Sequence, residues 1–341
     1  MRSVLIDAPG RIRVDSVPDP VLPGSDGAIV AVETTAICGS DLHFYEGDYP
    51  LFEAVSLGHE AVGTVVDLGA DVHTVRVGDR VLVSSVAGCG CCVGCATGDP
   101  VTCVSGPRIF GSGALGGAQS ELLAVPSADF QLLRIPDGVD TEAALLLTDN
   151  LATGWAGAQR ADIPPGETVV VLGLGAVGLC AVRSAFALGA GTVLAVDPVA
   201  GRRDRAALSG ATTLAPPALS AIFEATDGRG AASVIDAVGN DTTMTDALTC
   251  VRPGGTVSVI GVHNLDPYPF PALMSLVRSV TLRMTTAPVQ RTWPQLIPLI
   301  QSGCLDTSGI FTESRPLEQA AAAYAAVASR SAECVKVALT L

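Results

Sequence analysis

The chain has 341 residues, 48% of them hydrophobic and 16% charged, which is typical of a folded protein with room for two domains. Its net charge of -14 and its pI near 4.6 exclude nucleic acid as the main partner, because phosphate binding requires a basic surface. An anionic membrane surface is excluded for the same reason.

The sequence predicts no targeting or membrane-spanning segment. The N-terminal apolar run meets Asp7 at once and is too short for a signal-peptide core. The most apolar segment, 169–182, is interrupted by glycines and stops at Arg183, so we expect a buried strand and helix there. We therefore expect a cytoplasmic protein, in which clustered cysteines serve metal binding or catalysis rather than disulfides.

Short antiparallel strands are predicted at the start of the chain. Residues 1–36 alternate apolar and polar positions between prolines and glycines, a pattern typical of such strands. The segments AVGTVVDLG (61–69) and VGDRVLVSS (77–85) predict two more. The chain is thus expected to be mostly β from the N-terminus past residue 85.

Between these strands, residues 37–60 gather several groups that bind metals or move protons. A catalytic zinc takes three N, S or O ligands and keeps one position open, so Cys38 and His59 are natural ligands. Ser40 and His43 lie close enough in sequence to Cys38 to remove a proton from whatever fills the open position. A lone cysteine is also often a buried small hydrophobe, so this stretch alone leaves both interpretations open.

A second cluster follows in AGCGCCVGCATGDPVTCVSG. The regular spacing predicts a closed zinc site in which the metal holds together a loop that lacks its own core. The alternative, a disulfide pair or scattered buried thiols, is disfavoured by that regularity. We expect Cys91 to be a bystander thiol. The four predicted ligands are Cys89, Cys92, Cys95 and Cys103.

The chain resembles the zinc-dependent medium-chain alcohol dehydrogenases. The resemblance rests on ICGSDLH, GHE, GDRV, the four-cysteine lobe, GGAQSELLAVP, TDNLATG, VLGLGAVG and the ending VKVALTL, which occur in the family's order over nearly the whole length. It implies an α/β fold with a Rossmann dinucleotide-binding domain and a mostly-β GroES-like catalytic domain that carries the zinc lobe. We expect the catalytic domain at 1–150 and 287–341, and the Rossmann domain at 151–286.

The resemblance also implies the catalytic zinc ligands. They match Cys38 and His59, with Glu60 adjacent, and Asp149 in TDNLATG stands where the third ligand is expected. Asp and Asn also lead at helix N-caps, so capping is the alternative for Asp149. Ligation is favoured because Cys38 and His59 need a third partner.

The segment after residue 151 alternates apolar strands with Ala-rich helices, as in a parallel sheet of βαβ units. Gly173, Gly175 and Gly178 follow a strand and open a helix in GxGxxG spacing, which allows a tight turn, approach of a pyrophosphate, and close packing of helix on strand. Asp197 ends the next strand, where an acid binds the adenosine ribose.

Asp197 favours NAD over NADP because it would repel a 2′-phosphate, whereas Arg202 and Arg203 could turn toward one. A homodimer or homotetramer is expected. From the resemblance, Thr153 and Val177 are expected to contact the nicotinamide, and Val262 to bind its carboxamide through the backbone. Lys336 is expected to touch the pyrophosphate, with a solvated surface charge as the alternative.

The implied reaction is hydride transfer between a small alcohol and NAD, giving an aldehyde or ketone, with two zinc ions per chain and the active site between the domains. Ser40, linked through the cofactor ribose to His43, would carry the alcohol proton to solvent. Asp41 and Glu60 would support the zinc ligands, Asp41 by orienting His59. Phe110 and Trp155 are expected as pocket walls.

Two alternatives stay open. One is a polyol or aldehyde (formaldehyde-type) dehydrogenase on the same scaffold, since the zinc and cofactor residues would be shared. The other is a non-catalytic cofactor-binding sensor, which would need no proton relay. The relay residues Ser40 and His43 therefore favour an enzyme.

Overall fold

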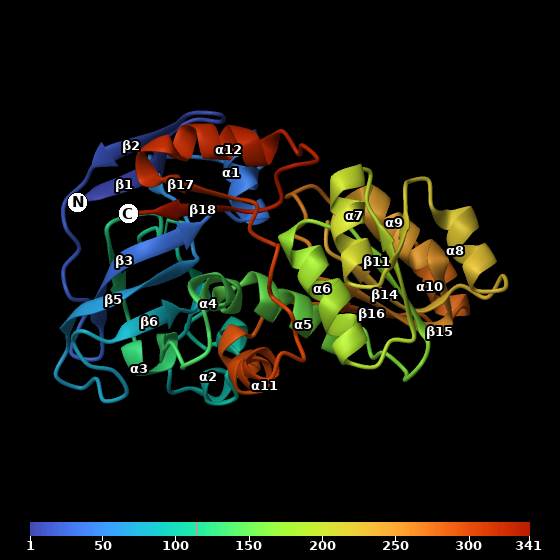
Figure 1. The fold of residues 1–341 in the computed structure, drawn as a ribbon, viewed down its shortest axis with the longest axis horizontal. Helices are drawn as coiled ribbons and strands as arrows, with labels where there is room; N and C mark the ends of the chain where they lie inside the picture. The colour runs from blue at the N-terminus through green and yellow to red at the C-terminus, as the bar shows by residue number, and fades with distance from the viewer. Residues whose placement is uncertain (114) are drawn as a thin grey trace.

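The computed structural model describes residues 1–113 and 115–341 and shows two lobes (Figure 1). The first lobe contains both termini, because the last strand of the chain pairs with the third strand. The second lobe is built from the middle of the chain. Helix α5 (Asn150–Arg160) lies between the lobes and packs against α6 (Ala176–Ala187) of the second.

The first lobe is built mainly on two sheets, as the alternating sequence predicts. A three-stranded sheet has the order β2-β1-β4, and a larger one the order β10-β6-β5-β3-β18-β17, with β9 also paired to β3. Only β17 and β18 pair in parallel within the larger sheet. The strands are β1 (Arg2–Ile6), β2 (Ile12–Ser16), β3 (Ala28–Ala36), β4 (Val55–Ser56), β5 (Ala61–Leu68), β6 (Arg80–Val83), β9 (Leu122–Val125), β10 (Leu132–Arg134), β17 (Glu313–Pro316) and β18 (Val337–Thr340), and a small pair joins β7 (Val86–Ala87) to β8 (Arg108–Ile109).

Short helices connect these strands. Asp140 begins α4 by accepting a hydrogen bond from the Ala143 backbone amide at 2.8 Å, which satisfies one free N–H of the first turn. Helix α11 continues through Pro294 and Pro298 and buries one face against α4 and α5. The helices of this lobe are α1 (Leu42–Glu46), α2 (Val93–Ala96), α3 (Ala128–Gln131), α4 (Thr141–Thr148), α11 (Val289–Gln301) and α12 (Ala320–Ala328), with 3-10 turns η1 (Gly39–Asp41), η2 (Pro100–Thr102) and η3 (Leu317–Gln319).

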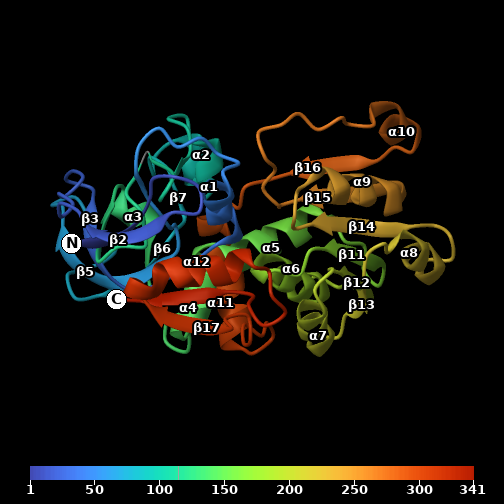
Figure 2. The same ribbon diagram turned by 90° about the horizontal axis from the view of Figure 1, so that it is seen from above.

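The second lobe is a six-stranded parallel sheet with the order β13-β12-β11-β14-β15-β16, which confirms the expected Rossmann domain. Its strands are largely buried apolar runs, as required when helices cover both faces. Figure 2 shows α10 beyond β16, at the outer edge. The remaining elements are β11 (Thr168–Leu172), β12 (Thr192–Val196), α7 (Ala200–Leu208), β13 (Thr212–Leu214), α8 (Leu219–Ala225), β14 (Ala231–Asp236), α9 (Asp241–Cys250), β15 (Val251–Val259), α10 (Ala272–Val277) and β16 (Thr281–Met284).

In the described part of the chain, no helix combines the length and apolar character that crossing a bilayer needs. The segment 169–182 forms β11 and the first half of α6, and most of its side chains are buried in the Rossmann lobe. The domain limits at 150 and 286 stay a proposal.

Candidate metal centre and dinucleotide site

Four potential metal ligands meet at the end of β3. One donor atom each from Cys38, His59, Glu60 and Asp149 lies within 4.8 Å of the other three. The Cys38 Sγ is 3.4 Å from Asp149 Oδ2, and the His59 Nε2 is 3.2 Å from the same oxygen. A thiol, an imidazole and two carboxylates thus lie together. This is the arrangement that the sequence predicts for Cys38, His59 and Asp149, with Glu60 beside them.

The backbone at Asp149 explains why its side chain is free to bind. Asp149 lies between α4 and α5 with φ −156° and ψ −72°, which ends one helix before the next begins. Its carboxylate makes no capping bond to the α5 backbone. Instead Oδ1 accepts a hydrogen bond from Thr153 Oγ1 at 2.9 Å, and Oδ2 faces Cys38 and His59. This arrangement supports ligation over capping.

Asp41 holds both ligands of the first segment. Its Oδ1 is 3.4 Å from His59 Nδ1, and its Oδ2 accepts a hydrogen bond from the Cys38 backbone N–H at 2.9 Å. Gln119, which the sequence did not single out, donates to the same oxygen at 3.3 Å and accepts from the Tyr324 hydroxyl at 2.9 Å. Asp41 is therefore placed to orient the His59 ring, leaving Nε2 for the centre of the cluster.

The electrostatics of the cluster fit a bound cation. Burial alone would raise the pKa of Asp149, but the hydrogen bond and charge of His59 lower that pKa to about 2. Burial and then the charge of Asp149 raise the pKa of Cys38. Two buried polar oxygens, Glu60 Oε2 and Asn150 Oδ1, have no hydrogen-bond partner. Zinc fits this donor set because it accepts S, N and O ligands together.

The four cysteines predicted as a closed site also come together. One Sγ each of Cys89, Cys92, Cys95 and Cys103 lies within 4.8 Å of the others, and all ten cysteines are free thiols, so the structure holds no disulfide pair there. Backbone N–H groups of Cys91 and Cys92 lower the pKa of Cys89 to about 6, which favours a thiolate. The cluster fits a structural zinc lobe, and the exposed Cys91 lies outside the four.

Each of the three glycines of the Rossmann loop is favoured at its position for a different structural reason. Gly173 has φ +85°, which a residue with a side chain rarely adopts. A Cβ on Gly178 would lie 1.8 Å from the Gly173 carbonyl oxygen. A Cβ on Gly175 would meet nothing within 4 Å, and Gly175 is the N-cap of α6. This open space before a helix N-terminus fits a pyrophosphate, because free N–H groups and the helix dipole favour an anion there.

Comparison with known proteins agrees with this geometry. Residues 24–137 match the model of the alcohol dehydrogenase GroES-like domain, and residues 176–302 match that of the zinc-binding dehydrogenases. A Mycobacterium tuberculosis protein named probable zinc-binding alcohol dehydrogenase is 67% identical over 98% of this chain and 87% of its own length. The chain belongs to the zinc-dependent medium-chain dehydrogenases.

Several solved structures of dehydrogenases share the whole fold. The alcohol dehydrogenase of Thermus sp. ATN1 aligns with a TM-score of 0.92 and 35% identity, covering 100% of this chain and 99% of its own. An Escherichia coli protein titled a short chain alcohol dehydrogenase and solved with NADH aligns with a TM-score of 0.86 and 26% identity, covering 100% of this chain and 99% of its own. A Sinorhizobium meliloti protein titled a zinc-binding dehydrogenase and solved with NADP aligns with a TM-score of 0.84 and 28% identity, covering 100% of this chain and 99% of its own.

The structure corrects the expected role of Lys336 in this dehydrogenase. Its side chain is 1% exposed, and its ammonium donates to Glu60 Oε1 at 2.8 Å and to the Ile37 carbonyl oxygen at 3.3 Å. The ring of Phe311 lies 5.6 Å away on another side. An ammonium so enclosed has no free face for a pyrophosphate, so the sequence-based assignment was wrong. Lys336 instead neutralises a carboxylate of the metal centre.

The proposed relay residues lie on and beside η1. Ser40 Oγ is 3.4 Å from His59 Nε2, at the metal centre. His43 Nδ1 hydrogen-bonds Asp48 Oδ2 at 2.7 Å, and its ring stacks on Tyr49 with 5.0 Å between centroids. Asp48 and Tyr49 were not predicted as neighbours of His43. They follow it by a few residues across a turn at a glycine with positive φ, and this proximity in sequence could have identified them.

Asp197 is buried and bonded within the protein. Its Oδ2 accepts a hydrogen bond from the Leu174 N–H at 2.7 Å, inside the glycine loop, and its Oδ1 accepts one from Val199 at 2.8 Å. Arg203 donates to the Asp197 carbonyl oxygen, and Arg202 to that of Cys334 at 3.5 Å. Both arginines thus have partners in the protein, and Asp197 lies next to the loop expected to hold the pyrophosphate.

Three further residues were expected at the nicotinamide. Thr153 is buried one helical turn beyond Asp149 and bonded to it. Val177 is half-buried at the start of α6, and Val262 is exposed just after β15. A Cβ on Gly154 would lie 2.7 Å from the Ala181 backbone nitrogen, so α5 and α6 approach closely. This close packing connects the metal centre to the dinucleotide loop.

Two expected pocket walls belong to the core instead. Phe110 is 1% exposed and packs inside the first lobe. Trp155 is 5% exposed and donates its indole N–H to Gln295 at 2.8 Å. The assignment of both residues as pocket walls was wrong, because large aromatic side chains favour burial wherever a core is available.

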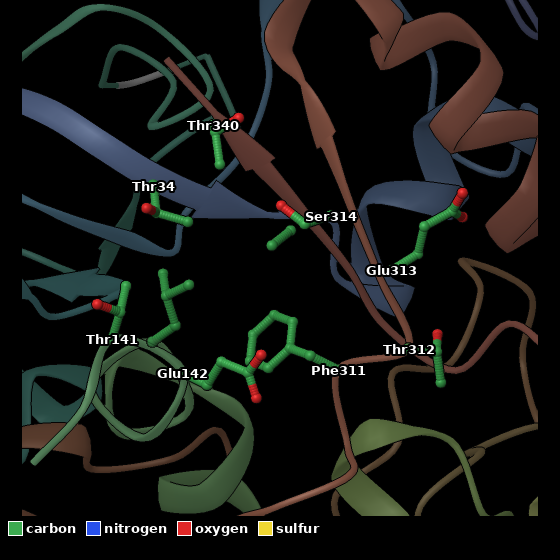
Figure 3. A pocket seen from close by; sticks show the side chains of 10 residues that line it. Thr34, Thr141, Glu142, Phe311, Thr312, Glu313, Ser314 and Thr340 are labelled. Atoms are coloured by element: carbon green, nitrogen blue, oxygen red, sulfur yellow. The ribbon is translucent and has the colours of Figure 1, made fainter.

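A cavity of about 430 Å³ lies on another side of this dehydrogenase (Figure 3). Hydroxyl groups, two carboxylates and the Phe311 ring line it, from β3, α4, β17 and β18. None of the predicted metal, relay or cofactor residues lines it, and its Phe311 ring lies 5.6 Å from the ammonium of Lys336. Its lining residues are Thr34, Thr141, Glu142, Leu145, Phe311, Thr312, Glu313, Ser314, Ala338 and Thr340.

Proposed function

We propose that this medium-chain dehydrogenase oxidises a small alcohol to an aldehyde or ketone, and catalyses the reverse reaction, with NAD as hydride acceptor. The observation that carries the proposal is the convergence of Cys38, His59 and Asp149 from distant parts of the chain, with the Ser40 hydroxyl 3.4 Å from His59 Nε2. A cofactor-binding sensor would have no use for that hydroxyl.

Cys38, His59 and Asp149 would hold a catalytic zinc, and the cysteine lobe a structural one, which gives two per chain. When bound, the catalytic zinc polarises the alcohol oxygen and lowers its pKa. Asp41 fixes the His59 ring, and Lys336 balances the charge of Glu60, whose second oxygen is unpartnered.

The chain's own groups would carry the alcohol proton to solvent. Ser40 would accept the alcohol proton at Oγ while giving up its own, and His43 would receive a proton and release it to solvent. Bound NAD would supply ribose hydroxyls for this transfer. Asp48 holds Nδ1 of His43, so the other ring nitrogen is available to take up the proton. The Tyr49 ring restricts rotation of the imidazole. These contacts support the relay role proposed for His43.

The buried Asp197 supports NAD over NADP. Its carboxylate stands at the end of β12 beside the glycine loop, where it can bind ribose hydroxyls and would repel a 2′-phosphate. Arg202 and Arg203, the residues able to favour NADP, donate to backbone carbonyls instead.

We further propose that the protein is a homo-oligomer. Helix α10 buries none of its residues, and it lies next to β16, the edge strand of the Rossmann sheet. A sheet edge beside a large apolar surface is typical of a protein interface. The exposed apolar side chains of this surface, here called the edge patch, are Leu265, Phe270, Leu273, Met274, Leu276, Val277 and Met284.

The test is turnover over a panel of primary, secondary and polyhydric alcohols and their carbonyl products, followed by nicotinamide absorbance with NAD and NADP. We expect oxidation of at least one alcohol class, with a higher kcat/KM for NAD than for NADP. The variant Cys38→Ser should lose turnover and also lose one of the two zinc ions. Zinc-loaded protein that binds NADH without turning over any member of the panel would favour the sensor alternative.

A further inference from the structure

Asn150 lies in the metal centre beside Asp149, and neither metal ligation nor proton transfer as described above uses it. It is the first residue of α5, directly after Asp149, and its side chain is 1% exposed. The adjacent Asp149 would account for metal ligation and for the break between α4 and α5, so neither feature requires Asn150. Burying a polar amide costs free energy unless the amide is hydrogen-bonded, so its contacts carry the argument.

All contacts of the Asn150 side-chain nitrogen are to groups of the metal centre. Nδ2 donates toward Glu60 Oε1 at 3.1 Å, Asp149 Oδ2 at 3.2 Å and Cys38 Sγ at 3.7 Å. All three acceptors are anionic when the carboxyl groups are ionised and the thiol is deprotonated by a metal. The side-chain oxygen has no partner, so the environment selects the donor half of the amide.

Glu60 is the group that Asn150 shares with Lys336. Its Oε1 receives hydrogen bonds from Asn150 at 3.1 Å and from Lys336 at 2.8 Å, whereas its Oε2 has no partner. Two donors on one oxygen fix the carboxylate in a single orientation. Lys336 supplies the positive charge and one hydrogen bond, and Asn150 supplies a second hydrogen bond to the same oxygen.

We propose that Asn150 is a positioning residue that sets how Glu60 and the Cys38 thiolate face the catalytic metal. Its amide bonds Glu60 on one side and the sulfur on the other, which keeps their separation fixed without adding charge. The inference rests on the proposed metal centre and extends it to a residue that does not itself bind the metal.

The hydrogen bond to sulfur has an electronic consequence. An N–H donor draws electron density from a thiolate, so removing it makes Cys38 a stronger electron donor to a metal. Removing it also leaves Glu60 with Lys336 as its only hydrogen-bond donor. Outer partners of this kind change metal affinity by roughly 10- to 100-fold when they are lost.

The experiment uses the full-length protein with cobalt(II) in place of the catalytic metal. In Asn150→Ala we expect the thiolate-to-cobalt charge-transfer band to move to longer wavelength, and the metal to be lost to a chelator roughly 10- to 100-fold more readily than in the wild type. In Asn150→Leu, which keeps a similar volume but removes the N–H donors, we expect the same direction of both changes. Neither readout requires turnover.

Gln290 supplies a matched control, because it is also a buried amide, and its side chain contacts Val86 and Gln131 instead of the metal centre. Gln290→Ala should lower the melting temperature and leave the cobalt band unmoved. If Asn150→Ala behaves in the same way, with an unchanged band and unchanged metal retention, the positioning role is refuted. A wild-type protein that binds no metal at Cys38 would instead refute the proposed function.

Discussion

The His43 imidazole lies outside the metal ligands and is held by Asp48 and Tyr49. For His43→Gln we therefore expect normal zinc content and NAD affinity, with alcohol oxidation slowed by roughly 10²- to 10⁴-fold, the range of general acid–base groups. The defect should shrink as pH rises, because the alcohol then needs less help to ionise. A pH–rate profile beside a zinc assay measures both effects.

Asp48→Asn serves as the companion variant. It keeps the geometry around His43 Nδ1 and removes the negative charge, so we expect a smaller defect than in His43→Gln. A pH-independent loss of rate in His43→Gln, accompanied by lost zinc, would assign His43 to the structure of the site rather than to proton transfer.

The buried pair of Lys336 and Glu60 predicts a stability effect. Lys336→Met leaves the Glu60 carboxylate buried without its counter-charge, so the free energy of unfolding should fall by about 3–5 kcal/mol. Denaturant titration of the zinc-loaded protein measures it. The double variant Lys336→Met with Glu60→Gln should recover much of the loss, since no uncompensated charge is then buried. Equal destabilisation of the single and double variants would contradict the ion-pair interpretation.

For individual residues, the sequence predicts those roles that local spacing and side-chain chemistry determine. Cys38 and His59 could be identified because thiol and imidazole groups at such spacing suit zinc, and Asp149 because it stands in a family motif. The role of Lys336 could not be predicted, since its partner Glu60 is 276 residues away and only the fold brings them together. The resemblance suggested a pyrophosphate contact, but burial directs the ammonium inward.

Among the structural elements, the cysteine lobe depends most on its metal. Between residues 88 and 106 the chain forms only the four-residue α2 and a short 3-10 turn, and few of its side chains reach the core. Cys95→Ser should therefore remove one zinc per chain and lower the melting temperature, because metal binding supplies folding free energy to such a loop. Metal analysis and a thermal scan test this.

Cys91→Ser is the matched control, because Cys91 is exposed and lies outside the four-sulfur group. It should keep both metals and the wild-type melting temperature. Retention of the full zinc content by Cys95→Ser would rule out the assigned ligand set. The lobe could be predicted from sequence because its four ligands lie within fifteen residues. Helix α11 is harder to predict, since Pro294 and Pro298 interrupt its sequence pattern and its packing on α4 and α5 is not local.

For the whole molecule, alternating and continuous apolar patterns predicted the two lobes and the parallel sheet. Helix α5 lies at their junction and carries Thr153 beside Asp149, so the same element positions the metal centre and packs on the dinucleotide-binding lobe. The sequence could not show that the edge patch stays exposed. Its residues are as apolar as core residues, and only the fold places them outside.

The edge patch predicts how the chain assembles. Leu276 is 75% exposed on α10, next to the free edge of β16, so we expect it to be covered in an isologous contact with a second copy. Leu276→Glu places a charge in that contact and should shift the protein toward monomers in sedimentation velocity, with the Rossmann lobe still folded. Leu208→Glu is the control, because Leu208 is 88% exposed on α7, outside the edge patch. If the wild type sediments as a monomer, or if both variants dissociate equally, the edge patch is not the interface.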